Sequence, residues 1–153
     1  MTTVQEKKVI VFNLNGEEYA VPVQSVGSIE RMMQITRVPK TEHFIKGVIN
    51  LKGVVTPIVD LRLRFGTERR EYDDSTRIII VYCRDMEIGL VVDGANDVID
   101  IPLKAIEPPP EVINAVHADY IEGVVKLGNR LLVLLDLEKV LDKKELGFTK
   151  LEA

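Results

Sequence analysis

The chain of 153 residues contains the same sequence pattern twice. Segment 44–65 recurs as segment 120–141, at an offset of 76 residues and with 6 of 22 positions identical. The preceding segments, 8–23 and 77–92, also match each other, at an offset of 69 residues. A period near 70 residues is too long for a solenoid repeat and close to the size of one small domain. The duplication therefore predicts two similar subdomains, which either form a groove between them or present two faces.

Short apolar runs separated by turn residues predict the fold class. The runs 9–14 and 19–23 flank Asn15-Gly16, a dipeptide that strongly favours a hairpin turn. The runs 48–51 and 54–61 flank a second turn at Lys52-Gly53. Further predicted strands are 77–83, 88–92, 98–101, 124–127 and 131–135, with a turn at Arg84-Asp85 after the first of them. Strands this short and this evenly spaced are typical of an all-β protein with two small barrels.

Helical patterns are confined to a few short segments. Residues 137–141 have apolar side chains at helical spacing, and Asp136 is a candidate N-cap. The equivalent residues 61–65 predict a single turn that ends at Gly66, where glycine is favoured. Residues 110–117 predict a short helix that begins with proline.

Composition limits the classes of function. The net charge of −4 argues against bulk binding to nucleic acid or to anionic membranes. No apolar run approaches the roughly 20 residues of a membrane span, and the N-terminal segment has no signal-peptide core. A single cysteine, Cys83, forms no internal disulfide, which favours a reducing cytoplasm. Residues 1–76 carry a balance of +1 and residues 77–153 a balance of −5. Either this difference orients the protein between two partners, or it is drift in surface charge.

No catalytic, metal-binding or phosphate-binding motif emerges from the sequence. The chemically capable residues all have structural interpretations, and we predict no enzyme activity and no cofactor. Cys83 ends a β-branched run and is interpreted as a buried hydrophobe. The remaining candidates are interpreted as surface, strand-edge or capping residues: His43, His117, Asp93, Asp97, Asp100, Asp60 and Asp136. The basic residues near position 65 lack interleaved aromatic residues, which argues against nucleic-acid recognition.

Residues 50–62 resemble the signature strand pair of the CheW family of chemotaxis coupling proteins. They read Asn-Leu-Lys-Gly-Val-Val-Thr-Pro-Ile-Val-Asp-Leu-Arg. Segments 17–21, 44–48 and 89–94 also resemble the family and occur in its order, so that the resemblance runs from about residue 9 to 141. It implies one CheW-like domain over residues 1–153, with two tandem SH3-like five-stranded β-barrel subdomains on a shared core and a short C-terminal helix. We expect subdomain 1 at 9–72 and subdomain 2 at 77–141, and the N-terminal strand pairing with subdomain 2 is an alternative.

The resemblance also implies a function. CheW-like proteins are non-enzymatic adaptors that couple the cytoplasmic tips of chemoreceptors to the histidine kinase CheA, whose regulatory domain is itself CheW-like. This implies a cytoplasmic protein, held at receptor arrays through its partners, without a cofactor, nucleic acid or direct insertion into the membrane. Two alternatives stay open. One is the coupling module of a CheV-like protein, although the chain is too short to hold that family's receiver domain; the other is a standalone small-ligand-binding β-barrel.

Two candidate surfaces follow from the resemblance, and plain barrel structure is the competing explanation at each position. The expected receptor-binding groove lies between the subdomains and is lined by Val26, Ile29 and Val98. Three further receptor-binding residues are expected close to it: Gly47, Lys52 and Gly53. The expected kinase-binding residues are Arg37, Val38, Pro39, Lys40, Thr41 and Phe44. The chain departs from many family members in having Ser28 instead of glutamate and Lys52 instead of arginine. The second change loses the bidentate fork of a guanidinium group.

Overall fold

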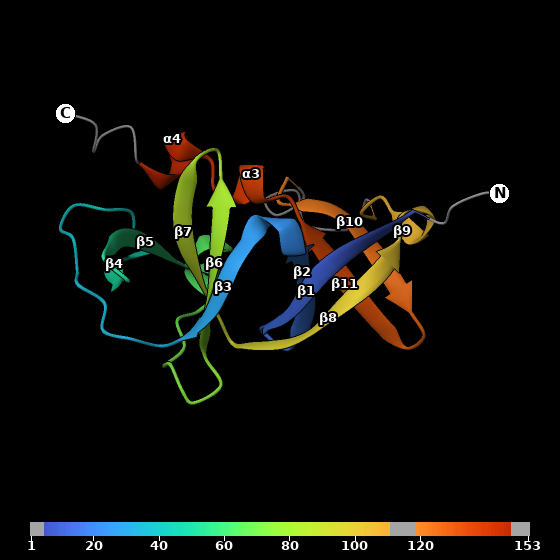
Figure 1. Ribbon diagram of the computed structural model, residues 1–153, viewed down its shortest axis with the longest axis horizontal. Helices are drawn as coiled ribbons and strands as arrows, with labels where there is room; N and C mark the ends of the chain where they lie inside the picture. The colour runs from blue at the N-terminus through green and yellow to red at the C-terminus, as the bar shows by residue number, and fades with distance from the viewer. Residues whose placement is uncertain (1–4, 111–118, 148–153) are drawn as a thin grey trace.

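A computed structural model describes residues 5–110 and 119–147 (Figure 1). Within these residues, the strands form two sheets and confirm the predicted all-β fold of two SH3-like barrel subdomains. The six-stranded sheet has the order β8 (Gly94–Pro102), β1 (Glu6–Leu14), β2 (Glu17–Pro22), β11 (Arg130–Leu135), β10 (Ile121–Leu127) and β9 (Ile106–Glu107). The five-stranded sheet has the order β3 (Val26–Arg31), β6 (Arg77–Cys83), β7 (Met86–Val92), β5 (Val54–Asp60) and β4 (Ile45–Leu51).

Helices are short and lie mainly near the C-terminal end of the described chain. They are α1 (Leu61–Arg64), α3 (Leu137–Val140) and α4 (Lys143–Leu146), with 3-10 turns η1 (Val23–Ser25) and η2 (Leu103–Ala105). The predicted helix at 137–141 is confirmed as α3, and the single turn at 61–65 as α1. The helix predicted at 110–117 falls on residues 111–118, outside the described part. Among the described residues, no helix has the length and apolar character needed to cross a membrane.

Each sheet combines hairpins from both copies of the sequence repeat. The β1–β2 hairpin of the first copy joins the β10–β11 hairpin of the second through a parallel pairing of β2 with β11. The equivalent β6–β7 hairpin joins β4–β5 through a parallel pairing of β7 with β5. The sheets therefore do not coincide with the stretches 9–72 and 77–141, and the N-terminal strand pairs with β8. Since the duplicated hairpins are similar in sequence, similarity alone could not reveal which copy supplies each partner.

Three buried clusters explain the apolar runs of the sequence. The central cluster packs residues of both sheets together, among them Phe12, Ile79 and Leu135. A second cluster fills the six-stranded sheet's barrel, and a third, including Ile78, fills the five-stranded sheet's barrel. Alternate residues of β1 and β6 face different clusters, so these strands are buried on both faces. This burial accounts for their nearly continuous apolar sequence.

The tight hairpin turns form where the sequence predicts them. Asn15 and Gly16 have φ angles of 57° and 77°, and Arg84 and Asp85 have φ angles of 49° and 65°. Positive φ at both central residues matches the twist of the flanking antiparallel strands. These turns fix the register of β1–β2 and of β6–β7.

Candidate partner-binding surfaces

Two exposed apolar residues of the expected receptor surface lie on edge strands. Ile29 on β3 is 41% exposed and Val98 on β8 is 55% exposed. The two strands are the edges of different sheets and lie in the central part of the molecule, between the outer β4–β5 and β10–β11 hairpins (Figure 1). Val26 is half-buried against the central cluster. An exposed apolar residue on each sheet's edge is suited to a partner that contacts both subdomains.

The other expected receptor residues do not lie on these two strands. Lys52 and Gly53 form the exposed turn between β4 and β5, where the Gly53 N–H donates to Asn50 Oδ1 at 2.8 Å. Figure 1 places this hairpin at the outer end of the five-stranded sheet. Gly47 is buried in a bulge of β4, where a β-carbon would collide with the carbonyl oxygen of Thr36. Gly47 therefore has a structural role, because it lets the chain at Thr36 pair closely alongside β4 in an antiparallel bridge with Val48.

The residues expected to bind the kinase lie in three different places: an apolar cavity, a second pocket and the core. Val38, Lys40 and Thr41 line an apolar cavity of about 280 Å³ together with β4, β5 and the end of α4. Arg37 lines a different pocket, beside Lys46. Pro39 is exposed, whereas Phe44 is only 6% exposed and belongs to the central cluster. The Phe44 side chain thus supports this region from beneath and is not part of its surface.

Arg64 connects the two subdomains and was identified from sequence only as one of several basic residues. Its guanidinium group lies 4.9 Å from the Phe44 ring centroid and 4.7 Å from the Tyr120 ring centroid. Phe44 and Tyr120 occupy equivalent positions in the sequence repeat. Arg64 Nε donates to the Val140 carbonyl oxygen at 2.8 Å, and the same group pairs with Glu145. These contacts attach α3 and α4 to the junction of the two copies.

A half-buried ion pair joins α1 to the end of β7. Arg62 donates to both oxygens of Asp93, at 2.8 and 2.7 Å, and the backbone N–H of Asn15 donates to the same carboxylate at 2.8 Å. Burial acts to raise the pKa of Asp93, but the bonds from Arg62 and Asn15 outweigh it, so this pKa lies below its ordinary value. The hydrogen bond to Asp93 raises the pKa of Arg62. Asp93 thus has a structural role as the ion-pair partner of Arg62. The sequence analysis did not predict this pairing.

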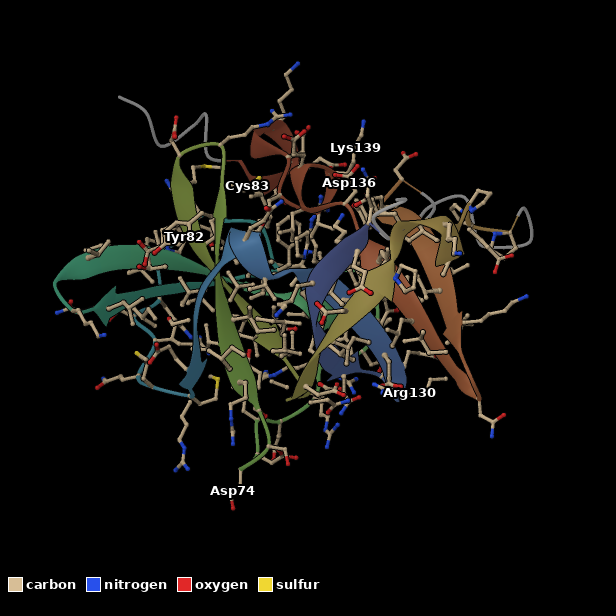
Figure 2. All side chains as sticks on the ribbon, turned by 45° about the vertical axis from the view of Figure 1, so that its right-hand side comes forward. Asp74, Tyr82, Cys83, Arg130, Asp136 and Lys139 are labelled. Atoms are coloured by element: carbon tan, nitrogen blue, oxygen red, sulfur yellow. The ribbon has the colours of Figure 1, made fainter. Side chains whose placement is uncertain are left out.

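A polar network crosses four strands of the six-stranded sheet. Arg130 donates to both oxygens of Glu18, at 3.1 and 2.8 Å, and lies 3.4 Å from Asp97. The hydrogen bond from Arg130 lowers the pKa of Glu18. Figure 2 shows Arg130 at the lower end of this sheet, far from Asp136 at the other end of β11. Asp97 is therefore an ion-pair residue at a strand edge.

The twin aspartates Asp60 and Asp136 cap helices, as the sequence predicts. Asp60 accepts from the Leu63 N–H, and Asp136 accepts from the N–H groups of Glu138 and Lys139. Cys83 is buried, and burial raises the pKa of its thiol, which disfavours the nucleophilic thiolate. Among the described residues, no group of three His, Cys, Asp or Glu side chains is placed to hold a metal ion. These residues therefore have structural explanations.

Comparison with known proteins identifies the family. The sequence model of the CheW-like domain matches residues 8–145. The chain belongs to the CheW-like domain family. The family resemblance read from the signature strand pair is thereby confirmed, and it extends over most of the two subdomains.

Curated and solved members of the CheW-like family are similar over nearly the whole chain. The chemotaxis protein CheW of Bacillus subtilis is 50% identical over 138 residues, which cover 90% of this chain and 88% of that protein. The chemotaxis protein CheW of Klebsiella aerogenes is 38% identical over 138 residues, covering 90% and 83%. The crystal structure of the scaffolding protein TtCheW from Thermoanaerobacter tengcongensis superposes with a TM-score of 0.83 at 35% identity, covering 90% of this chain and 94% of that one.

Proposed function

We propose that this protein is a non-enzymatic chemotaxis adaptor that couples chemoreceptor cytoplasmic tips to the regulatory domain of the histidine kinase CheA. The observation that carries the proposal is the CheW-like match over residues 8–145, which spans both subdomains. Relatives of similar length are named chemotaxis protein CheW, and a similar solved structure is titled a scaffolding protein. The adaptor acts in the cytoplasm, at receptor arrays that it reaches through its partners.

The receptor tip is proposed to bind along the edge strands β3 and β8. Ile29 and Val98 offer exposed apolar side chains there, and Val26 is half-buried on β3 against the central cluster. The cytoplasmic tips of the chemoreceptors that CheW-like proteins bind are α-helical hairpins. An amphipathic helix can bind by packing its apolar face against exposed apolar residues such as Ile29 and Val98. Lys52 and Gly53, at the exposed β4–β5 turn, are proposed as outer contacts of the same partner.

The kinase is proposed to bind at the apolar cavity formed by Val38, Lys40 and Thr41. The cavity walls are mainly apolar and come from the 38–42 segment, β4, β5 and α4. Exposed Pro39 lies in the same segment and extends the contact surface. The two proposed surfaces use different residues of the five-stranded sheet, which allows one adaptor molecule to bind both partners at once.

A pair of pull-down experiments tests the proposal. The purified chain is immobilised and incubated with the CheA regulatory domain or with a receptor cytoplasmic fragment, each from the same cell. We expect both to be retained, because an adaptor needs two binding partners. Retention of neither would contradict the adaptor function, and a screen of small ligands would then test the β-barrel alternative.

A further inference from the structure

A pocket of about 340 Å³ beside β4 is lined mainly by positive side chains. Arg37 comes from the loop before β4, Lys46 from β4 itself, and Arg69 and Arg70 from the segment after α1. Ile35, Glu71 and Tyr72 complete the lining. Four cations and one carboxylate give the lining a formal charge of +3, in a chain whose net charge is −4. The pocket is therefore a positive site on an acidic protein.

Three of these cations have no counterion within the described part of the chain. Arg37, Lys46 and Arg69 form no ion pair with any residue in 5–110 or 119–147. Arg70 is paired, at 3.0 Å from Asp73 and 3.5 Å from Asp93. Gathered positive charges repel one another, and a bound anion would relieve that repulsion.

The form of the pocket favours carboxylates over a free phosphate ion. Phosphate sites commonly use the N–H groups of a helix N-terminus, and none of the seven lining residues begins a helix. Guanidinium groups match the two oxygens of a carboxylate, and two arginines, Arg37 and Arg69, have no such partner. Ile35 and the Tyr72 ring supply an apolar wall for the methylene groups of a glutamate side chain.

The pocket is separate from the cavity proposed for the kinase. Arg37 lines the positive pocket, whereas its neighbour Val38 lines the apolar cavity. Along β4, Lys46 lines the positive pocket, whereas Ile45 and Gly47 line the cavity. This division follows from the alternation of side chains along extended chain. A ligand of the positive pocket therefore uses side chains that the cavity does not.

We propose that this pocket binds an acidic peptide segment of a protein partner, one that presents at least two carboxylates. The exposed positions of Arg37, Arg69 and Arg70 leave the pocket open to solvent, so that side chains projecting from a larger partner can enter it. The proposal rests on the pocket's charge and lining, and it holds whether or not the adaptor function is correct.

An NMR titration of the whole chain tests this inference. The probe is a capped Gly-Glu-Glu-Gly-Glu-Glu-Gly peptide, and a peptide with glutamine in place of each glutamate is the neutral control. We expect amide shifts at residues 35–37, 46 and 69–72, with binding that weakens as salt is added. The variant Lys46→Glu with Arg69→Glu should weaken binding by about tenfold, because two attractive contacts become repulsive.

A matched variant separates the pocket from general charge attraction. Lys104→Glu with Lys139→Glu makes the same change in net charge at two exposed positions outside the pocket, and should alter the affinity by less than about twofold. Equal weakening by both variants, or equal binding of the glutamine peptide, would overturn the proposal. Pyrophosphate is titrated in parallel. If it shifts the pocket amides and the acidic peptide does not, the site is one for free phosphates, and the peptide assignment is wrong.

Discussion

At the scale of single residues, Gly47 shows how the lack of a side chain permits two backbone segments to pair closely. Its φ angle is +139°, and the Thr36 carbonyl oxygen occupies the space that a β-carbon would need. The equivalent Gly123 is also closely approached, because a β-carbon there would lie 2.7 Å from the Ile106 side chain and 2.8 Å from the Glu107 carbonyl oxygen, although its φ angle is not positive. The two glycines occupy equivalent positions of the sequence repeat, and each allows another segment to pair closely alongside its strand.

Gly47→Ala is predicted to lower the free energy of unfolding by about 3 kcal/mol, because it combines a backbone collision with an unfavourable φ angle. Gly128→Ala is the matched control. Gly128 also has a positive φ angle, 60°, but open space around its β-carbon position, so the expected loss is about 1 kcal/mol. Urea unfolding of both variants measures the difference. Equal losses would mean that the close pairing with Thr36 is not what requires glycine at position 47.

Val98→Glu is predicted to weaken receptor binding at least about tenfold while leaving kinase binding nearly unchanged, because it places an unpaired charge in an apolar contact. Leu131→Glu is the control, since Leu131 is similarly exposed, at 52%, but lies on the outer β10–β11 hairpin. Isothermal titration with each partner measures both affinities. Equal loss of receptor binding in the two variants would contradict the proposed β3–β8 surface.

Asp93→Asn is predicted to remove about 2 kcal/mol of stability at pH 7, through loss of the charged hydrogen bonds to Arg62. The pKa of Asp93 is lowered in the folded state, so its contribution is complete above the unfolded value of about 3.9 and is lost as the pH falls through the folded value. The stability gap between wild type and variant should therefore narrow below about pH 4. A gap that stays constant from pH 7 to pH 3 would contradict the assigned shift.

At the scale of elements, the twin helix caps have different environments. Asp136 is half-buried and caps α3, whereas Asp60 is buried and also accepts a hydrogen bond from the Tyr72 hydroxyl at 2.8 Å. Burial and the neighbouring Asp60 carboxylate raise the pKa of Tyr72, which keeps this hydroxyl as a donor. Both copies of the repeat thus have an aspartate that caps a helix. In the first copy, this aspartate also accepts the hydrogen bond from Tyr72.

Asp136→Ala is predicted to cost about 1 kcal/mol, the usual value of an N-cap. Asp60→Ala is predicted to cost about 3 kcal/mol, because it also leaves the Tyr72 hydroxyl without its acceptor. Asp136→Asn keeps a capping oxygen and should stay within about 0.5 kcal/mol of the wild type. Thermal and urea unfolding give the comparison. Similar costs for the two alanine variants would show that the Tyr72 bond contributes little.

Most strands were predictable because their apolar runs end at strong turn residues. β3 was not predicted as a strand, because it alternates half-buried with exposed residues and includes Gly27, Ser28 and Glu30. A strand with one face against a core and one face exposed has a weaker apolar pattern than a doubly buried strand such as β6. The strand that carries Ile29 therefore had only a weak signal in the sequence.

At the scale of the whole molecule, the duplication predicted two subdomains but not the exchange of hairpins between them. The strands that pair between the two copies are far apart in the sequence. The local residue pattern of each strand therefore does not reveal its partner. The same limit applies to the candidate surfaces. The family resemblance placed Arg37 and Phe44 on one surface, whereas the structure has Arg37 in a positive pocket and Phe44 in the core. Arg64, which connects both copies, had no distinguishing sequence signal.

Coupling of receptors to the kinase is measured by the autophosphorylation rate of CheA in the presence of receptor fragments, with and without this protein. We predict that receptors change the kinase rate strongly only when the protein is present, and that Val98→Glu abolishes this effect while Leu131→Glu retains it. A receptor effect of equal size without the protein, or no effect with it, would contradict the adaptor function.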